Sequence, residues 1–427
     1  MLQLTSPLPN QVYQRNAQGR AYVSIKGTCP TDVVSLEVIC TPGIAGRLQT
    51  ATIPVINGAF TAVTILEQGD YTMVVSPVKA SGKDTAAAIT QKVGIGEVFV
   101  VWGHSVAQGD DRFHLGGATD PRVFTVGIDM TANGANAHYN TTGDAADLPS
   151  AIVPYASDVV PGPYGSSTHF WAKFAEKITL KYNVPTMLLN AAFGGTNLEQ
   201  WYKSITKTPF EHGFVDYRLG FPYINLKNAF TKYTSVSGFR AMLVDHGAND
   251  WQNTDYEAIF GYFKGIIEQA RIDSKSPKAA VVVNRATPFG KTGIRGVQQR
   301  VISDVAYCFA GPDYDAQILE EADFIDSGHI HLSVQGQAKA AQAWADAIPP
   351  TVLAKMVPYQ AKAVELITAP VETQKTDDTP LTISRFSKFK LAAISIDRNL
   401  LLGAVLAAVL ILGSFLLGRW SIRHRNA

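Results

Sequence analysis

Apolar runs of strand length alternate with amphipathic stretches of helix length from about residue 95 onward. Strands separated in this way by helices form a parallel sheet with helices on both faces. The strand-like runs are Glu97–Trp102, Thr186–Asn190, Phe239–Val244 and Ala279–Asn284, and the helical stretches are His169–Tyr182, Asp255–Arg271 and Ser333–Ile348. Sites in such sheets lie at the carboxyl ends of the strands. The sequence therefore predicts a three-layer α/β domain over residues 95–350 with its site at that edge.

Residues 1–94 have a different pattern, with short β-rich segments and no helical stretch between them. Gly, Pro, Asn and Asp separate the segments, which is typical of an all-β domain. The predicted strands are Ala21–Lys26, Val33–Cys40, Gln49–Val55, Ala59–Ile65 and Tyr71–Ser76. We expect a small, immunoglobulin-like β-sandwich here, serving as a spacer or binding module.

The segment Asn399–Gly418 contains about twenty residues without a charge, which is enough to cross a bilayer as a helix. Residues 351–398 resemble a linker and juxtamembrane segment, and the tail 419–427 is basic. The sequence thus predicts a single-pass C-terminal membrane anchor. We expect no signal peptide before the first domain, and basic residues flank both ends of the span, so the side of the membrane stays open. The oligomeric state also stays open.

Composition excludes several classes of function. The chain has 427 residues with 37 Lys and Arg against 36 Asp and Glu, a formal charge of +1. This balance gives no reason to expect a nucleic-acid partner. Its three cysteines do not form a disulfide framework, and no Cys and His residues have zinc-ligand spacing. We expect neither a metal nor an organic cofactor.

Four polar or glycine-rich motifs follow predicted strands or precede the last helix. They are Gly103–Val106, Asn190–Thr196, Gly247–Asp250 and Asp326–Gly336. A serine just past a strand is exposed at the sheet edge, and glycines let a backbone N–H approach a reacting oxygen. Asparagine carries further N–H donors, while a histidine oriented by an aspartate accepts a proton from serine. Together these groups match the needs of nucleophilic catalysis.

In their order and content the four motifs resemble those of the SGNH hydrolases, the GDSL-type esterase superfamily. The resemblance covers about residues 95–350 and implies a flavodoxin-like fold with a parallel sheet. The stretch Val93–Gly109, after a small β-domain, most resembles the carbohydrate acetylesterases related to sialate O-acetylesterase. This resemblance implies a serine esterase that acts on acyl esters, in particular O-acetyl groups, of a small molecule or glycan.

The resemblance also implies roles for individual residues. Ser105 corresponds to the nucleophile, and the oxyanion hole corresponds to the N–H groups of Ser105 and Gly195 with the side chain of Asn249. His104 and Val106 depart from the family, whose acetylesterase branch has Gln and Asn at these positions. His104, Trp201 and Trp251 are candidate substrate contacts, and Phe193 also flanks the motifs.

The last motif leaves the catalytic base open between two histidines. His329 fits the family's Asp-x-x-His spacing from Asp326, whereas His331 lies five residues before a helix glycine, as the family base does. Residues two apart in an extended segment point to the same side, so both are expected to face Ser105. We favour His331 as the base, oriented by Asp326.

Two further functions stay open at the level of the sequence. His104 and the displaced histidine are compatible with a degenerate hydrolase fold that binds carbohydrate without cleaving it. Alternatively, the chain is a membrane-tethered adhesion protein in which the β-domain is the active part. Labelling by a serine-directed reagent would argue against both alternatives.

Overall fold

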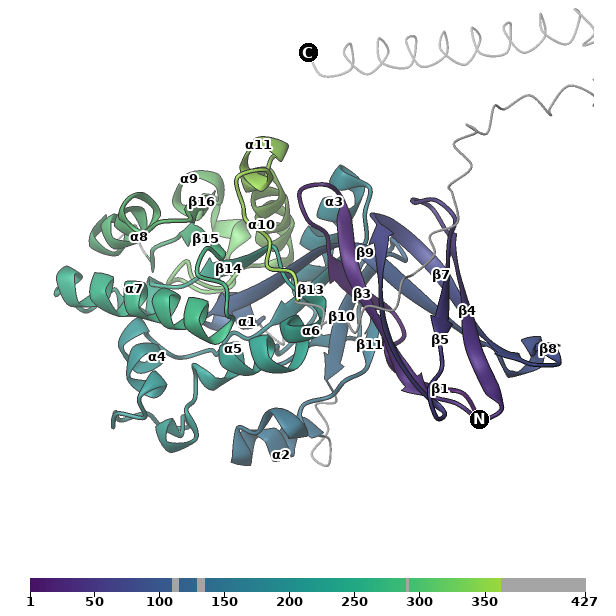
Figure 1. The fold of residues 1–427 in the computed structure, drawn as a ribbon. Helices are drawn as coiled ribbons and strands as arrows, with labels where there is room; N and C mark the ends of the chain where they lie inside the picture. Colours follow the sequence, from purple (N-terminus) through teal and green to yellow (C-terminus); the bar gives the residue numbers. More distant parts are fainter. Residues whose placement is uncertain (110–114, 129–134, 289–291, 362–427) are drawn as a thin grey trace, which may run out of the picture. The chain divides into compact units, whose positions relative to one another are not determined.

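The computed structural model describes residues 1–109, 115–128, 135–288 and 292–361, which all belong to one compact unit (Figure 1). Among these residues no helix combines the length and apolar character that a membrane crossing requires. The predicted span 399–418, the linker from residue 362 onward and the basic tail lie outside the described residues. The predicted membrane anchor therefore stays a prediction.

Within the described part of the chain, six parallel strands form the central sheet. In spatial order they are β10 (Val123–Ile128), β13 (Thr186–Asn190), β9 (Ile89–Gly103), β14 (Ala241–Asp245), β15 (Ala280–Arg285) and β16 (Cys308–Asp313). Without β10, the chain order of the other five strands is 2-1-3-4-5, which is the flavodoxin-like order. The short strands β11 (Ile152–Pro154) and β12 (Val160–Pro161) pair antiparallel with β10. The predicted α/β fold with parallel strands is confirmed.

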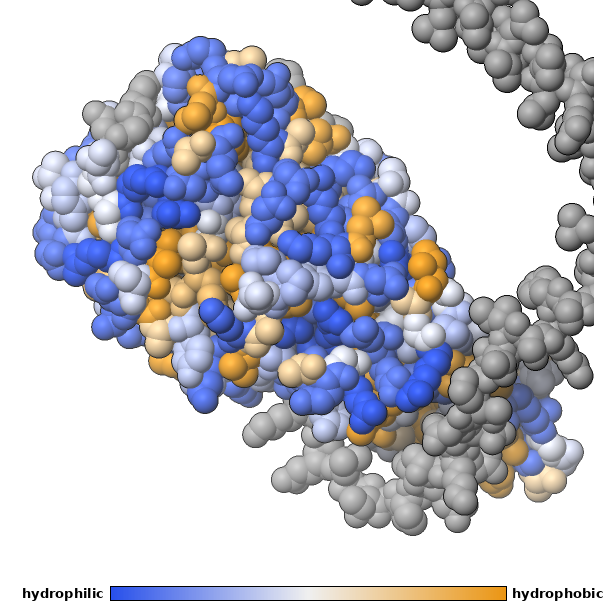
Figure 2. Space-filling model, turned by 90° about the horizontal axis from the view of Figure 1, so that it is seen from above, coloured by the Kyte–Doolittle hydropathy of each residue, from blue (hydrophilic) through white to orange (hydrophobic). Residues whose placement is uncertain are grey.

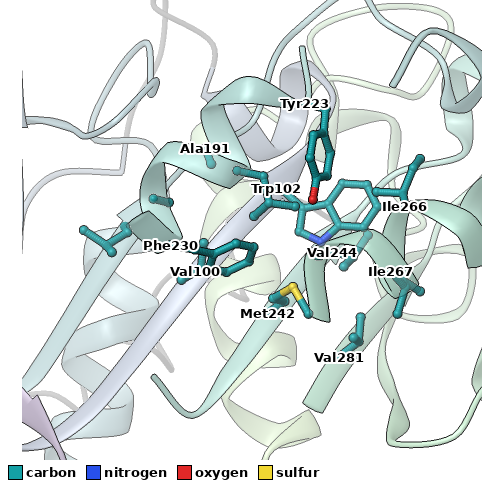
Figure 3. Close-up of a cluster of buried hydrophobic side chains, with 14 of the residues drawn as sticks. Val100, Trp102, Ala191, Tyr223, Phe230, Met242, Val244, Ile266, Ile267 and Val281 are labelled. Carbon is teal, nitrogen blue, oxygen red and sulfur yellow. The ribbon is translucent and has the colours of Figure 1, made fainter. Parts of the chain in front are cut away.

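Helices cover both faces of this sheet because its strands are apolar on both sides. Val98, Val100 and Trp102 of β9 belong to one buried cluster, and the alternating Phe99 and Val101 belong to another. The first cluster includes residues of α4 (Leu198–Ile205), α7 (Tyr256–Asp273) and α8 (Thr292–Asp304), and the second includes residues of α3 (Trp171–Tyr182) and α10 (Val334–Ala347). Figure 3 shows part of the first cluster, including Trp102, Met242, Val244 and Ile266.

The N-terminal region consists of β-strands, as predicted, and most of its strand pairs are antiparallel. One sheet contains β1 (Gln3–Ser6), β3 (Arg20–Thr28) and β6 (Ala59–Glu67). The other contains β4 (Val33–Pro42), β5 (Gln49–Pro54), β7 (Gly69–Lys79) and β8 (Gly82–Lys83). Alternate residues of both sheets share one hydrophobic core, among them Val23 and Ile25 of β3 and Val38 and Met73 of β4 and β7. This shared core is the arrangement of a two-sheet sandwich.

Strand β9 joins the two regions. Its first half pairs with β7 and with β2 (Gln11–Gln14), and its second half, from Glu97, is the central strand of the parallel sheet. The buried carboxylate of Glu97 lies 2.7 Å from guanidinium nitrogens of both Arg15 and Arg240, which compensates its burial at this junction. The predicted division between residues 94 and 95 falls inside this strand, and the domain boundaries stay a prediction.

The other α-helices of the described residues are short. They are α1 (Ser105–Gln108), α2 (Ala135–Thr142), α5 (Ile224–Asn228), α6 (Ser235–Ser237), α9 (Tyr314–Gln317) and α11 (Pro350–Leu353). The face of the molecule seen in Figure 2 carries mainly hydrophilic residues, with apolar residues in small groups among them.

Candidate active site

Ser105 lies where β9 ends and α1 begins, at the carboxyl edge of the sheet. The turn depends on Gly103, which has a φ of 152° and lies so close to β14 that a Cβ would be 2.0 Å from the carbonyl oxygen of Asp245. His104 then caps α1, since its Nδ1 accepts a hydrogen bond from the N–H of Val106. Ser105 is thereby the first residue of the helix, directly after the central strand β9, which lies between β13 and β14.

His331 is in direct contact with Ser105. The Ser105 Oγ lies 2.7 Å from Nε2 of His331, and Nδ1 of the same ring lies 2.6 Å from Oδ2 of Asp326. Both His331 and Asp326 are about one-third exposed or less, with side-chain accessibilities of 28% and 31%. The three side chains form one continuous line of hydrogen bonds, the geometry that activates a serine for nucleophilic attack.

Asp326 is held in its ionised form. Its partial burial opposes ionisation, but hydrogen bonds from the N–H groups of Ile330 and His331 and from the His331 ring outweigh burial and lower its pKa. An ionised carboxylate accepts the Nδ1–H of His331. That interaction leaves Nε2 unprotonated and able to accept the proton of Ser105.

His329 points elsewhere. Its backbone φ is 52°, its ring stacks on Phe324 with centroids 4.8 Å apart, and its Nε2 lies 3.0 Å from a carboxylate oxygen of Glu321. The expectation that both histidines face Ser105 fails because the chain is left-handed at His329 rather than extended. The structure brings together Ser105, His331 and Asp326.

The loop after β13 lies against Ser105. A Cβ on Gly194 would be 3.4 Å from Cα and Cβ of Ser105, and the Gly194 N–H donates to the side-chain oxygen of Gln108. Gly195 follows with a φ of 74°. Among the described residues neither its N–H nor that of Ser105 has an assigned acceptor. Both N–H groups are therefore available to an oxyanion.

Asn249 joins this loop from the neighbouring strand end. It is half-buried in the short turn after β14, and its Nδ2 donates to the carbonyl oxygen of Thr196, 2.9 Å away. One hydrogen bond leaves the second Nδ2 hydrogen for another acceptor. The three groups that the sequence assigns to the oxyanion hole thus come from the ends of three adjacent strands, β9, β13 and β14.

The predicted substrate contacts differ in their exposure. His104 and Trp201 have relative accessibilities of 1% and 0%. The Trp201 ring packs on Trp102, and its Nε1–H donates to Oγ1 of Thr196. It therefore supports the loop after β13 from the inside of the protein and has no exposed surface for a sugar. Trp251 is partly buried against the same core. Within the described part of the chain, no group of His, Cys, Asp and Glu side chains is arranged to hold a metal.

Behind Ser105 lies a pair of fully buried titratable groups, His104 and Asp245, with Nε2 and Oδ1 3.8 Å apart. Burial lowers the pKa of His104 to about 3, and the nearby His331 adds to this. Burial raises the pKa of Asp245 to about 7, and the nearby Asn284 side chain opposes this rise only in part. Both groups are therefore neutral in the folded protein in mildly acidic solution.

This pair predicts a pH-dependent effect of Asp245→Asn on stability. Between about pH 4 and 7 the unfolded chain ionises Asp245 while the folded protein keeps its proton, so this group lowers stability as pH rises. Without the carboxyl, the free energy of unfolding gains up to about 1.4 kcal/mol per pH unit relative to the wild type across that window. Urea unfolding at several pH values measures the difference. The exposed Asp346→Asn is the control, and parallel curves for wild type and Asp245→Asn would contradict the prediction.

Two aromatic residues that the motifs do not include also lie at this edge. Phe214 is 70% exposed, and its ring contacts the position that a Cβ of Gly195 would occupy, with its Cζ atom 2.9 Å away. His212 lies beside it, with Nε2 3.0 Å from the carbonyl oxygen of Gly195. The only sequence signal for these residues is an aromatic side chain within a polar, glycine-containing loop.

The fold and site define an α/β protein with a hydrogen-bonded Ser-His-Asp line at the carboxyl edge of its sheet. The solved structures that are similar to it include the following three. A carbohydrate acetylesterase from Xanthomonas citri aligns with 81% of this chain and 74% of its own at 13% identity, with a TM-score of 0.49. A protein from Arabidopsis thaliana aligns with 59% of this chain and 96% of its own at 14% identity and a TM-score of 0.40. The corresponding values for NanS are 59%, 95%, 12% and 0.37. No family model and no curated protein matches the sequence.

Proposed function

We propose that this protein is a serine esterase that hydrolyses acyl esters, with O-acetyl groups on carbohydrate as its substrates. The observation that carries the proposal is the line Ser105–His331–Asp326, with contacts of 2.7 and 2.6 Å, beside N–H groups that have no assigned protein acceptor among the described residues. The choice of an acetylated carbohydrate rests on the likeness of the sequence motifs to those of carbohydrate acetylesterases.

The first half of the proposed reaction forms an acyl-enzyme. His331 Nε2 takes the proton of Ser105 as its oxygen attacks the ester carbonyl carbon. The backbone N–H groups of Ser105 and Gly195 and the side-chain Nδ2–H of Asn249 stabilise the negative charge that develops on the carbonyl oxygen. The intermediate then collapses, the bond between the carbonyl carbon and the alcohol oxygen breaks, and His331 returns the proton to the leaving alcohol.

The second half releases the acid. Water attacks the carbonyl carbon of the acyl-serine while His331 accepts a proton from the water. Collapse of this intermediate breaks the bond to Ser105, whose oxygen regains the proton from His331. Asp326 remains ionised throughout and stabilises the imidazolium that forms twice in each cycle.

A serine-directed fluorophosphonate tests the proposal on the full chain. The wild type is expected to be labelled and to release acetate from acetylated sugars and from a simple aryl acetate. Ser105→Ala should lose both the label and the hydrolysis, because it removes the nucleophilic Oγ. The variant should still fold, because Ser105 is only partly buried and the substitution removes a single atom. The control Ser157→Ala removes a serine outside the site, one that accepts from the N–H of Gly117, and should retain both. An unlabelled wild type that is inert on every ester would contradict the proposal.

The predicted anchoring of this esterase by residues 399–418 is a separate proposal. It rests on the length and apolar character of that segment alone. Fractionation of the full chain and of a chain ending at residue 361 with liposomes tests it, and equal recovery of the two in the soluble fraction would count against an anchor.

A further inference from the structure

Phe214 belongs to a group of three nearly parallel aromatic rings beside the loop after β13, which contains Gly195. Its ring lies within 10° of parallel with Phe193, at a centroid distance of 6.2 Å, and Phe193 lies within 14° of parallel with Tyr164, at 4.8 Å. Phe193 itself is only 5% exposed. The inner rings thus belong to the core, and they fix the plane of the outermost ring.

His212 also contacts the Phe214 ring. The imidazole lies perpendicular to the Phe214 ring, with centroids 4.4 Å apart. Its Nδ1 accepts from the N–H of Phe214, so Nε2 carries the proton and donates to the carbonyl oxygen of Gly195. Phe214 is therefore tied to the residue whose N–H faces the developing oxyanion, and it is held in place before any ligand arrives.

The exposed area of Phe214 calls for a ligand of a particular shape. The ring stacks on Phe193 and its Cζ atom lies near Gly195, yet the residue is 70% exposed, so a large part of its surface is open to solvent. A flat, open aromatic face matches the C–H face of a pyranose ring, whose hydroxyls project outward to water and to neighbouring polar groups. A long acyl chain requires instead an enclosed apolar channel to remove most of its surface from water.

We propose that Phe214, positioned by Phe193 and His212, is the platform on which the sugar ring of the substrate lies while its acetyl ester reaches Ser105. This inference rests on the proposed esterase function and adds the part of the substrate that the site recognises. It makes Phe214 a specificity-determining residue that discriminates acetylated sugars from esters of small alcohols.

The test compares two acetyl esters, glucose pentaacetate and methyl acetate, which lacks a ring. Phe214→Leu keeps an apolar side chain but removes the ring plane. It is expected to lower kcat/KM for the sugar ester about tenfold, mainly through KM, and to leave kcat/KM for methyl acetate within about twofold. Phe214→Trp, which keeps an aromatic ring at this position, should have a kcat/KM for the sugar ester close to that of the wild type. Tyr202→Leu, which alters an exposed aromatic residue that packs on Tyr262 of α7, is the matched control and should change neither value.

Two results would overturn the platform. An equal loss on both esters in Phe214→Leu would assign the ring to the support of Gly195 rather than to the sugar. A loss confined to an ester with a long acyl chain, such as methyl octanoate, would assign the ring to the acyl side. A wild type that cleaves none of the three esters contradicts the esterase proposal itself, and this outcome is distinct from both.

Discussion

Replacing His331 with alanine is expected to lower kcat for acetyl-ester hydrolysis by about 10⁴-fold or more, because it removes the general base from the proposed Ser-His-Asp triad. His331 is the histidine whose Nε2 lies 2.7 Å from the Ser105 Oγ. His329→Ala should leave kcat within about twofold of the wild type, since the His329 ring stacks on Phe324 and pairs with Glu321 instead. Steady-state kinetics of both variants on an aryl acetate measures the difference.

The two variants are matched controls for each other. Both histidines lie in the same loop and are partly exposed, with side-chain accessibilities of 28% and 35%, so neither substitution opens a cavity in the core. Thermal unfolding checks that both variants fold. A loss of activity in His329→Ala with His331→Ala still active would reverse the assignment, and equal losses in both would assign the effect to the loop as a whole.

The choice between these histidines illustrates what a sequence pattern leaves undetermined. Both follow Asp326 within five residues, and an extended chain would bring both to the same side. The φ of 52° at His329 turns its side chain away from the direction that an extended chain would give it. A positive φ is uncommon for any residue other than glycine, so the sequence did not predict it at this position. By contrast, Ser105, Gly195 and Asn249 meet because each follows a parallel strand of the same sheet.

The fold was predictable wherever apolar runs were long and uninterrupted, as in β9, β13, β14 and β15. Strand β16 is different, because it contains Gly311 and Pro312, residues typical of turns. A Cβ on Gly311 would be 2.7 Å from the carbonyl oxygen of Val283, so the glycine permits close pairing with β15. Proline is tolerated there because β16 is the edge strand of the parallel sheet.

Aromatic residues were the hardest part of the site to predict. Trp201 lies near a motif in sequence and on the inner face of α4, where the sheet buries it completely. Phe214 is nineteen residues beyond Gly195 in the numbering, and a loop returns it to that glycine. Proximity in sequence therefore favoured Trp201, a ring that is fully buried. The ring of the proposed platform, Phe214, is positioned by tertiary packing on Phe193, which no short motif encodes.

Asp326→Asn is expected to lower kcat by about 10⁴-fold, even though it changes a carboxylate only to an amide of the same shape. Oδ2 of Asp326 accepts from both the N–H and the Nδ1–H of His331, and Oδ1 accepts from the N–H of Ile330. An amide offers one acceptor atom and one donor group. If its NH₂ faces His331, it opposes the backbone N–H of His331, donates to Nδ1 and places the ring proton on Nε2, so the ring no longer accepts the proton of Ser105. If its NH₂ faces Ile330 instead, two donors oppose each other and the loop is destabilised.

The comparison with Asp323→Asn separates catalysis from folding. Asp323 is the more deeply buried of the two acids, and it accepts from Lys339 and Gln335 without contacting His331. Its substitution should lower the free energy of unfolding, because it weakens a buried charge-assisted contact, while kcat stays within a few-fold of the wild type. Asp326→Asn should show the opposite balance, a large loss in kcat with a smaller loss in stability. If Asp326→Asn keeps kcat within about tenfold while folding normally, the tautomer of His331 is set by something other than this carboxylate, and the proposed role of Asp326 fails.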